Sequence, residues 1–124
     1  MQPPVFQTLG TAAVKALVGS SPVRIYDFDS APQNVAAPYI TWAMVVGQPY
    51  DHLSGPPQAD FESVQIDCYT GPADDARAAA RSLATAVRDA LDVAGVHNRV
   101  IIQTRETETK LFRVSIEADF ITNR

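Results

Sequence analysis

The sequence is poor in the residues on which stapled folds and many catalytic sites depend. It has one cysteine, Cys68, so neither an internal disulfide nor a cluster of thiolate metal ligands can form within the chain. No segment approaches the roughly 18 consecutive apolar residues of a membrane-spanning helix. Residues 1–4 have neither the basic region nor the apolar run of a signal peptide. We therefore expect a protein that is made and kept in cytosol-like conditions.

Histidine and lysine are scarce as well, with two of each. Asp27 and Asp29 have the Asp-x-Asp spacing of phosphatases that use a carboxylate nucleophile and Mg²⁺, but the strand–helix alternation of those enzymes is missing. Two acids that start a turn are the preferred interpretation. A metal site built from His52, His97 and a carboxylate stays open as a weaker alternative. We expect Cys68 to be a small buried hydrophobe, and we predict no catalytic residue, no metal ligand and no cofactor.

What is present is an ordinary globular composition. The chain has 124 residues, of which 46% are hydrophobic and 19% are charged. This length predicts a single domain, spanning residues 1–124. The formal net charge of −4 argues against a broad basic surface that would neutralise the phosphates of nucleic acid.

The strongest pattern lies in residues 70–95, which we predict to form one long amphipathic helix. Its apolar residues recur at intervals of three and four, and Pro72 and Gly95 fit the first helical position and the stop. Small side chains let a helix lie close against a flat surface, so we expect this helix to pack on a sheet. The apolar stripe consists of Ala76, Ala80, Leu83, Val87, Ala90 and Ala94.

The remaining elements complete an α+β pattern. Residues 39–46 are apolar, aromatic or β-branched on both faces, which predicts a central strand covered on both sides. The order of one helix, three strands, one helix and two strands predicts a mostly antiparallel sheet of about five strands, packed against two helices as a two-layer sandwich. The other strand segments are 23–28, 61–69, 100–103 and 111–120, with 96–98 as a connector.

The first helix is predicted over residues 3–18, between two prolines and Gly19. Its expected apolar stripe consists of Phe6, Leu9, Ala13, Ala16 and Leu17. Two connections are candidates for function. Residues 47–60 contain two glycines and three prolines and predict a long exposed loop, and loops of this length are usually functional. Residues 104–110 predict a charged hairpin tip.

Taken together, the chain resembles the tail-terminator family of long-tailed bacteriophages, whose members are also called tail-to-head joining or tail completion proteins. The resemblance covers nearly the whole chain and rests on the order and spacing of weak motifs. These are the proline-led strand at 38–41, the Val-Gln-Ile-Asp-Cys-Tyr strand at 64–69, the end of the alanine-rich helix at 87–91 and the closing strand at 112–120.

The resemblance implies a structural protein of the virion, made in the host cytoplasm, and no enzyme. Such proteins assemble as a ring, usually a homo-hexamer, that caps the tail tube and ends its polymerisation. The partners it implies are further copies of the chain, the major tail tube protein and the neck connector or stopper protein. DNA passes through the bore without sequence-specific binding, and no membrane is involved.

We expect two segments to contact these partners. Tyr50, Asp51, His52 and Leu53 form the expected partner-binding loop, and the expected contacts at the hairpin tip are Arg105, Glu106, Glu108 and Lys110. Two alternatives stay open beside the terminator. The first is a head-side neck connector or stopper protein of the same virion. The second is a small-molecule binding domain with its ligand between helix and sheet, for which the alanine-lined helix leaves little room.

Overall fold

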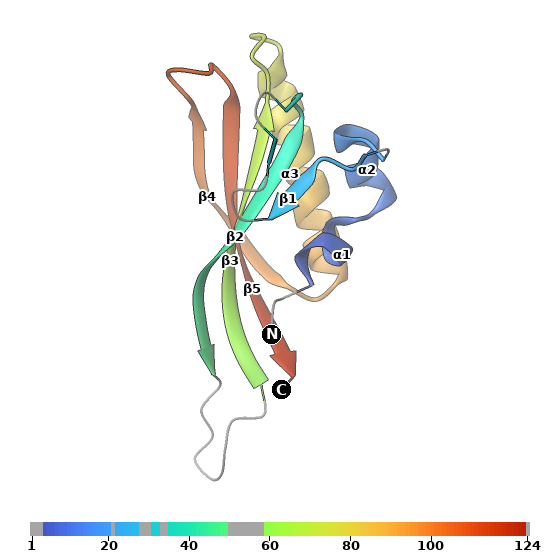
Figure 1. Cartoon of the computed structure of the whole chain (residues 1–124), viewed down its shortest axis with the longest axis vertical. Helices are drawn as coiled ribbons and strands as arrows, with labels where there is room; N and C mark the ends of the chain where they lie inside the picture. Colours follow the sequence, from blue (N-terminus) through green and yellow to red (C-terminus); the bar gives the residue numbers. More distant parts are fainter. Residues whose placement is uncertain (1–3, 21, 28–30, 33–34, 50–58, 124) are drawn as a thin grey trace.

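The computed structural model describes residues 4–20, 22–27, 31–32, 35–49 and 59–123. A five-stranded sheet in the order β1-β2-β3-β5-β4 carries the helices on one face (Figure 1). β1 pairs with β2 in parallel, and the other three pairs are antiparallel, so the predicted α+β fold is confirmed. The strands are β1 (Ile25–Asp27), β2 (Tyr39–Pro49), β3 (Ala59–Thr70), β4 (His97–Arg105) and β5 (Phe112–Asn123).

The long helix α3 (Ala76–Val93) lies across β3, β5 and β4 and buries most of the predicted stripe. Its fully buried residues include Leu83 and Val87, and the small alanines between them allow close packing on the sheet. The stop at Gly95 is confirmed. Gly95 has φ +75°, and the next amide, of Val96, donates to the carbonyl of Leu91 at 2.9 Å. This arrangement is a common way to end a helix.

The start of α3 differs from the prediction. The helix begins at Ala76, so Pro72 lies in the preceding turn instead of at the first helical position. Gly71, at φ +116°, lets the chain turn directly after β3. The Thr70 hydroxyl then donates to the carbonyl of Ala76 at 2.8 Å and fixes the turn to the first residue of the helix.

The first predicted helix is two short helices, α1 (Val5–Leu9) and α2 (Ala12–Val18). Thr11 restarts the helix because its hydroxyl accepts from the amide of Val14 at 3.3 Å. The restart rotates the buried face, so the predicted stripe is largely wrong: Phe6 is 45% exposed, and Ala13 and Ala16 are exposed as well. The buried residues of these helices are Val5, Leu9, Val14 and Val18.

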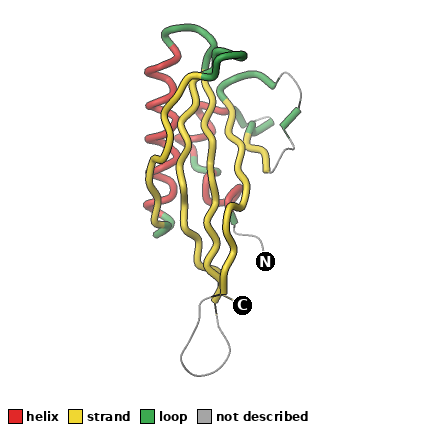
Figure 2. Tube along the Cα trace, turned by 90° about the vertical axis from the view of Figure 1, so that its left-hand side faces the viewer, coloured by secondary structure: helices red, strands yellow, loops and turns green. Residues whose placement is uncertain are grey.

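The prediction that β2 is covered on both sides is also wrong. β2 is an inner strand, but the described helices all lie on one side of the sheet, and Figure 2 views the molecule from the other side. Ile40 and Trp42 are buried under the helices, whereas Tyr39, Thr41 and Ala43 lie half-buried on the opposite side. We call this uncovered side the open face.

Residues 97 and 98 belong to β4 and not to a connector. Asn98 is buried, and its side chain ties the end of α3 to the strand. Its amide nitrogen donates to Asp92 at 2.8 Å and to the carbonyl of Val96 at 2.9 Å, while its oxygen accepts from Arg88 at 2.8 Å. A polar junction of this kind gives no periodic signal in the sequence, which is why the strand start was misplaced.

The two candidate connections lie at opposite ends of the sheet. β2 ends and β3 begins at the lower end in Figure 1, where these strands and β5 continue beyond the helices. The tip between β4 and β5 lies at the upper end, beside the start of α3. No helix in the described part of the chain is long and apolar enough to cross a membrane.

Candidate interaction surfaces

The tip between β4 and β5 is held by Arg105. Its guanidinium donates to the carbonyls of Lys110 at 3.0 Å and Pro72 at 2.8 Å and pairs with Asp74 at 3.1 Å. Of the other predicted contact residues, Glu106 accepts a hydrogen bond from the Thr109 hydroxyl, while Glu108 and Lys110 are exposed. Arg105 therefore fixes the tip to the turn before α3, and Glu108 and Lys110 present opposite charges to solvent.

The other predicted contact residues, Tyr50, Asp51, His52 and Leu53, lie outside the described residues. The structure instead shortens the predicted loop, because β2 continues to Pro49 and β3 begins at Ala59. Pro49 and Ala59, where these two strands end and begin, lie at the end of the sheet away from the β4–β5 tip.

The open face carries a network of paired charges over β3, β5 and β4. Asp67 accepts hydrogen bonds from Ser115 and Gln65 and lies 3.5 Å from the guanidinium of Arg113. A second group joins Arg99 to Glu117 and to Asp119, and Asp119 also accepts from the hydroxyl of Ser63 at 2.9 Å. These side chains come from neighbouring strands in register, so the sheet itself positions them.

The open face changes character toward β2. Tyr39 and Tyr69 stack with their ring centroids 4.8 Å apart. Burial, reinforced by the carboxylate of Asp67, raises the pKa of Tyr69 to about 12. Burial likewise raises the pKa of Tyr39, with a smaller contribution from Glu106. Beside the rings lies a hollow of about 450 Å³ whose lining includes Ala43 and Val45, and Val45 is 54% exposed.

The two edges of the sheet are unequal. β1 covers three residues of β2, whereas β4 is a nine-residue edge strand with Ile101 and Ile102 each 39% exposed. A register shift between Val100 and Ile102 interrupts its pairing with β5. Bulges and short strands are ways in which proteins limit uncontrolled pairing at sheet edges, while exposed isoleucines favour a specific contact.

Comparison with known proteins shows the family to which the chain belongs. The profile of the family described as tail completion protein gp17 matches residues 3–123. The chain belongs to this family. It is accordingly a structural protein of the tail or neck of a phage-like virion.

A solved structure supports the fold of this family member. A chain in the virion of a native gene transfer agent particle is 21% identical, with a TM-score of 0.65. The match covers 97% of this chain and 92% of that chain, so the two share one fold over almost their whole length. No curated protein sequence matches significantly.

Of the residues weighed for catalysis or metal binding, the two that the structure describes, Asp27 and His97, lie far apart. Asp27 ends β1 and His97 begins β4, which are opposite edges of the sheet. Four strand spacings of about 4.8 Å place them about 19 Å apart or more. Asp29 and His52 lie outside the described residues, and within the described part no three His, Cys, Asp or Glu residues are placed to hold a metal ion. Cys68 is fully buried as predicted, and burial raises the pKa of its thiol.

Proposed function

We propose that the chain forms a ring that caps the tail tube, ends its polymerisation and offers the opposite side of the ring to the neck. Family membership carries this proposal, and the arrangement of the surfaces supports it. The ring is a homo-hexamer, as the resemblance to tail-terminator proteins implies. It acts through its shape and charge and without catalysis.

Two contact regions at opposite ends of the sheet suit a two-sided adaptor. If the strands run along the ring axis, the β2–β3 end and the β4–β5 tip lie on opposite sides of the ring. Residues 50–53 would then meet one partner, and Glu106, Glu108 and Lys110 the other. The major tail tube protein and the neck connector or stopper are these two partners.

Ring closure needs a contact between two different surfaces of the same chain. The hollow beside Val45 lies toward the β1 side of the sheet, and the exposed isoleucines of β4 lie at the opposite edge. If the first surface of one copy contacts the second surface of its neighbour, the contact repeats head to tail. The assembly closes into a ring when a whole number of these rotations makes a full turn.

The charged network of the open face suits a bore through which DNA passes. Arg99 and Arg113 are both paired with carboxylates from neighbouring strands, so they offer little free positive charge to phosphates. The acidic net charge of the chain acts in the same direction.

Variants in the two proposed contact surfaces test ring closure. Val45→Asp and Ile102→Asp each place a charge in one of the two surfaces, and we expect each variant to stay folded but to leave isolated tail tubes uncapped in electron micrographs. In an equal mixture of the two variants, the unchanged surface of one variant can still contact the unchanged surface of the other. The next contact around the ring then joins two changed surfaces, so the mixture should also fail to close a ring. Val93→Asp, at an apolar residue of α3 that is 89% exposed, is the matched control and should cap normally. Capping by both edge variants would refute this contact.

Deletion of residues 51–58 tests the loop and separates the two ends. We expect a folded protein but tails of abnormal length or tails that fail to join heads, and normal virions from this deletion would contradict the role of the loop. Finding the chain on purified headless tails supports the terminator. Finding it on tailless heads alone would instead favour the head-side connector.

A further inference from the structure

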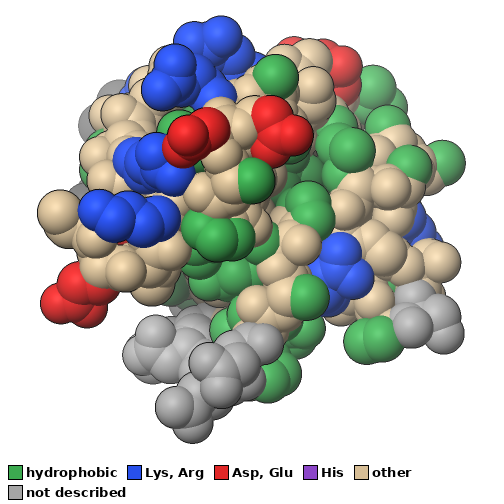
Figure 3. Space-filling view, turned by 90° about the horizontal axis from the view of Figure 1, so that it is seen from above, with side chains coloured by type: hydrophobic (Ala, Val, Ile, Leu, Met, Phe, Trp, Pro, Cys, Tyr) green, Lys and Arg blue, Asp and Glu red, His purple; other side chains and the backbone are tan. Residues whose placement is uncertain are grey.

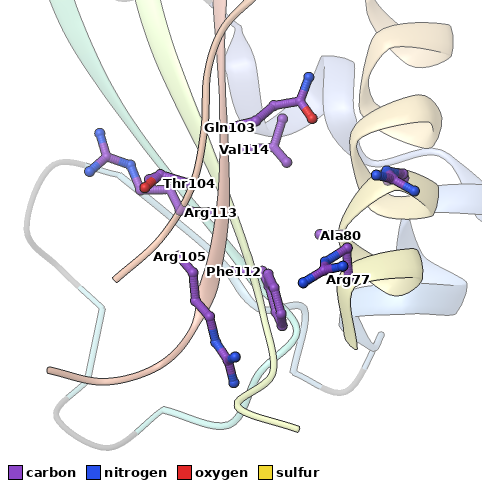
Figure 4. A pocket seen from close by; sticks show the side chains of 9 residues that line it. Arg77, Ala80, Gln103, Thr104, Arg105, Phe112, Arg113 and Val114 are labelled. Atoms are coloured by element: carbon purple, nitrogen blue, oxygen red, sulfur yellow. The ribbon is translucent and has the colours of Figure 1, made fainter. Parts of the chain in front are cut away.

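A basic cleft opens between the first half of α3 and the upper ends of β4 and β5. Its volume is about 280 Å³, and its floor is apolar, formed by Ala80, Phe112 and Val114. Figure 4 shows Phe112 between Arg105 and Arg77, with Gln103 and Val114 further along the cleft. Figure 3, which looks onto this end of the molecule, shows several Lys and Arg side chains toward the upper left, with Asp and Glu side chains beside them.

Four of the ten Lys and Arg residues of the chain line the cleft, but two of them are already engaged. Arg113 turns to the open face and pairs with Asp67. Arg105 stacks on Phe112 at 4.6 Å and pairs with Asp74, whose side chain is 94% exposed. These two arginines therefore serve the fold and contribute only part of their charge to the cleft.

Arg77 and Arg81 differ from the other arginines in the described part of the chain, because the structure gives them no hydrogen-bonded or ionic partner. Arg77 approaches the ring of the buried Phe112 at 5.7 Å, and the side chains of Arg77 and Arg81 are exposed. By contrast, Arg24, Arg88 and Arg99 each donate to a defined acceptor.

The positions of Arg77 and Arg81 are unfavourable for the isolated fold. Arg77 lies in the first turn of α3, where the positive end of the helix dipole repels cations, and Arg81 follows one turn later. They are also four residues apart on one helix, so their charges repel each other. An arrangement that opposes local electrostatics without an internal partner is typical of a site that serves binding.

We propose that this cleft binds an acidic segment of another virion protein, in which carboxylates lie beside an apolar side chain. The carboxylates pair with Arg77 and Arg81, and guanidinium groups recognise carboxylates in a bidentate manner. The apolar side chain covers Phe112 and Val114. An apolar floor with room for one or two side chains fits a peptide that carries an apolar side chain beside its carboxylates, whereas the phosphates of DNA offer no apolar group to cover it.

This inference deepens the proposed function because it gives the chemistry of one partner. It rests on the proposed function in one respect, namely that the partner is another protein of the virion. The test places a photoreactive benzoylphenylalanine at Gln103, an exposed position that lines the cleft. Assembled particles that carry this variant are irradiated, and the cross-linked products are identified by mass spectrometry.

We expect a cross-link to an Asp- or Glu-rich segment of a different virion protein. Adding Arg77→Gln and Arg81→Gln should lower the yield at least tenfold, with unchanged circular dichroism. Arg81→Gln alone should lower it more than Lys15→Gln, which removes one charge from α2 outside the cleft, and Arg81→Lys should restore part of the yield.

Cross-links to DNA, to a second copy of this chain or to a segment without acidic residues would each overturn the proposal, as would the absence of any product. The outcome is separable from that of the proposed function. A chain that does not control tail length can still give the acidic cross-link, and a chain that caps tails can lack it.

Discussion

The two faces of the sheet differ although they share the same strands. On β3, Val64, Ile66 and Cys68 are fully buried under the helices, while the residues between them face the open side. There Gln65 and Asp67 join a group of hydrogen bonds and an ion pair that connects β3 with Ser115 and Arg113 of β5. The covered face holds the fold together, whereas the open face keeps a defined arrangement of polar groups at the surface. Destabilising changes should therefore follow the covered face, whereas single changes on the open face should leave the fold intact.

The largest expected effect on stability comes from the covered face. Ile66→Ala removes a fully buried side chain from the centre of the sheet and should lower the free energy of unfolding by about 2–5 kcal/mol. The neighbouring variant Gln65→Ala changes the open face of the same strand and should cost less than about 1 kcal/mol. Urea denaturation measures both, and equal losses would show that the two faces contribute alike.

Sequence patterns predicted the covered face well, because burial on one side of a strand or helix imposes a period. The buried residues of β3, β5 and the middle of α3 follow that period. β2 shows the limit of this reasoning. Its open face, with Tyr39 and Ala43, is apolar enough to suggest a second covering layer, yet the described helices leave it uncovered. Apolar periodicity predicts that a surface is covered, but it does not tell whether this chain or another copy covers it.

A comparison within the basic cleft sharpens the contrast between structural and free charges. Arg105→Gln removes two hydrogen bonds to carbonyls and the pair with Asp74, and should lower the free energy of unfolding by about 1 kcal/mol. Arg77→Gln removes a cation from the start of a helix and should raise the free energy of unfolding by about 0.3–1 kcal/mol. Thermal or urea denaturation at low salt measures both. A loss with Arg77→Gln would mean that this residue supports the fold.

The cleft was not predictable from sequence, for a physical reason. Arg77 and Arg81 lie on the polar side of an amphipathic helix, where charged residues are expected whether or not they bind anything. What marks them is the missing partner, and a missing partner is visible only when β4 and β5 are placed beside the helix. Likewise, Arg105 was expected at a partner contact, and its contacts with Pro72 and Asp74 required the fold to be known.

The effect that is smallest near neutral pH, and is seen only in alkaline solution, concerns the tyrosine pair of the open face. In the unfolded chain Tyr69 has its ordinary pKa of about 10, and in the folded chain burial and Asp67 raise the pKa to about 12. The unfolded state therefore releases the proton first, and the contribution of Tyr69 to stability is complete below pH 10 and is lost as the pH rises to 12. Tyr69→Phe should remove this alkaline loss from urea denaturation curves. Asp67→Asn should shift the phenolate absorbance of Tyr69 to lower pH, and an unchanged titration would contradict the assigned cause.

We propose above that the chain ends tail growth by closing a ring on the tube. The length distribution of tails assembled in cells that lack this protein, measured in electron micrographs, tests it most directly. We expect tails that continue beyond the normal length and carry no heads, with normal length restored by the wild-type chain but not by Val45→Asp or Ile102→Asp. Tails of normal length joined to filled heads in the absence of the protein would contradict it.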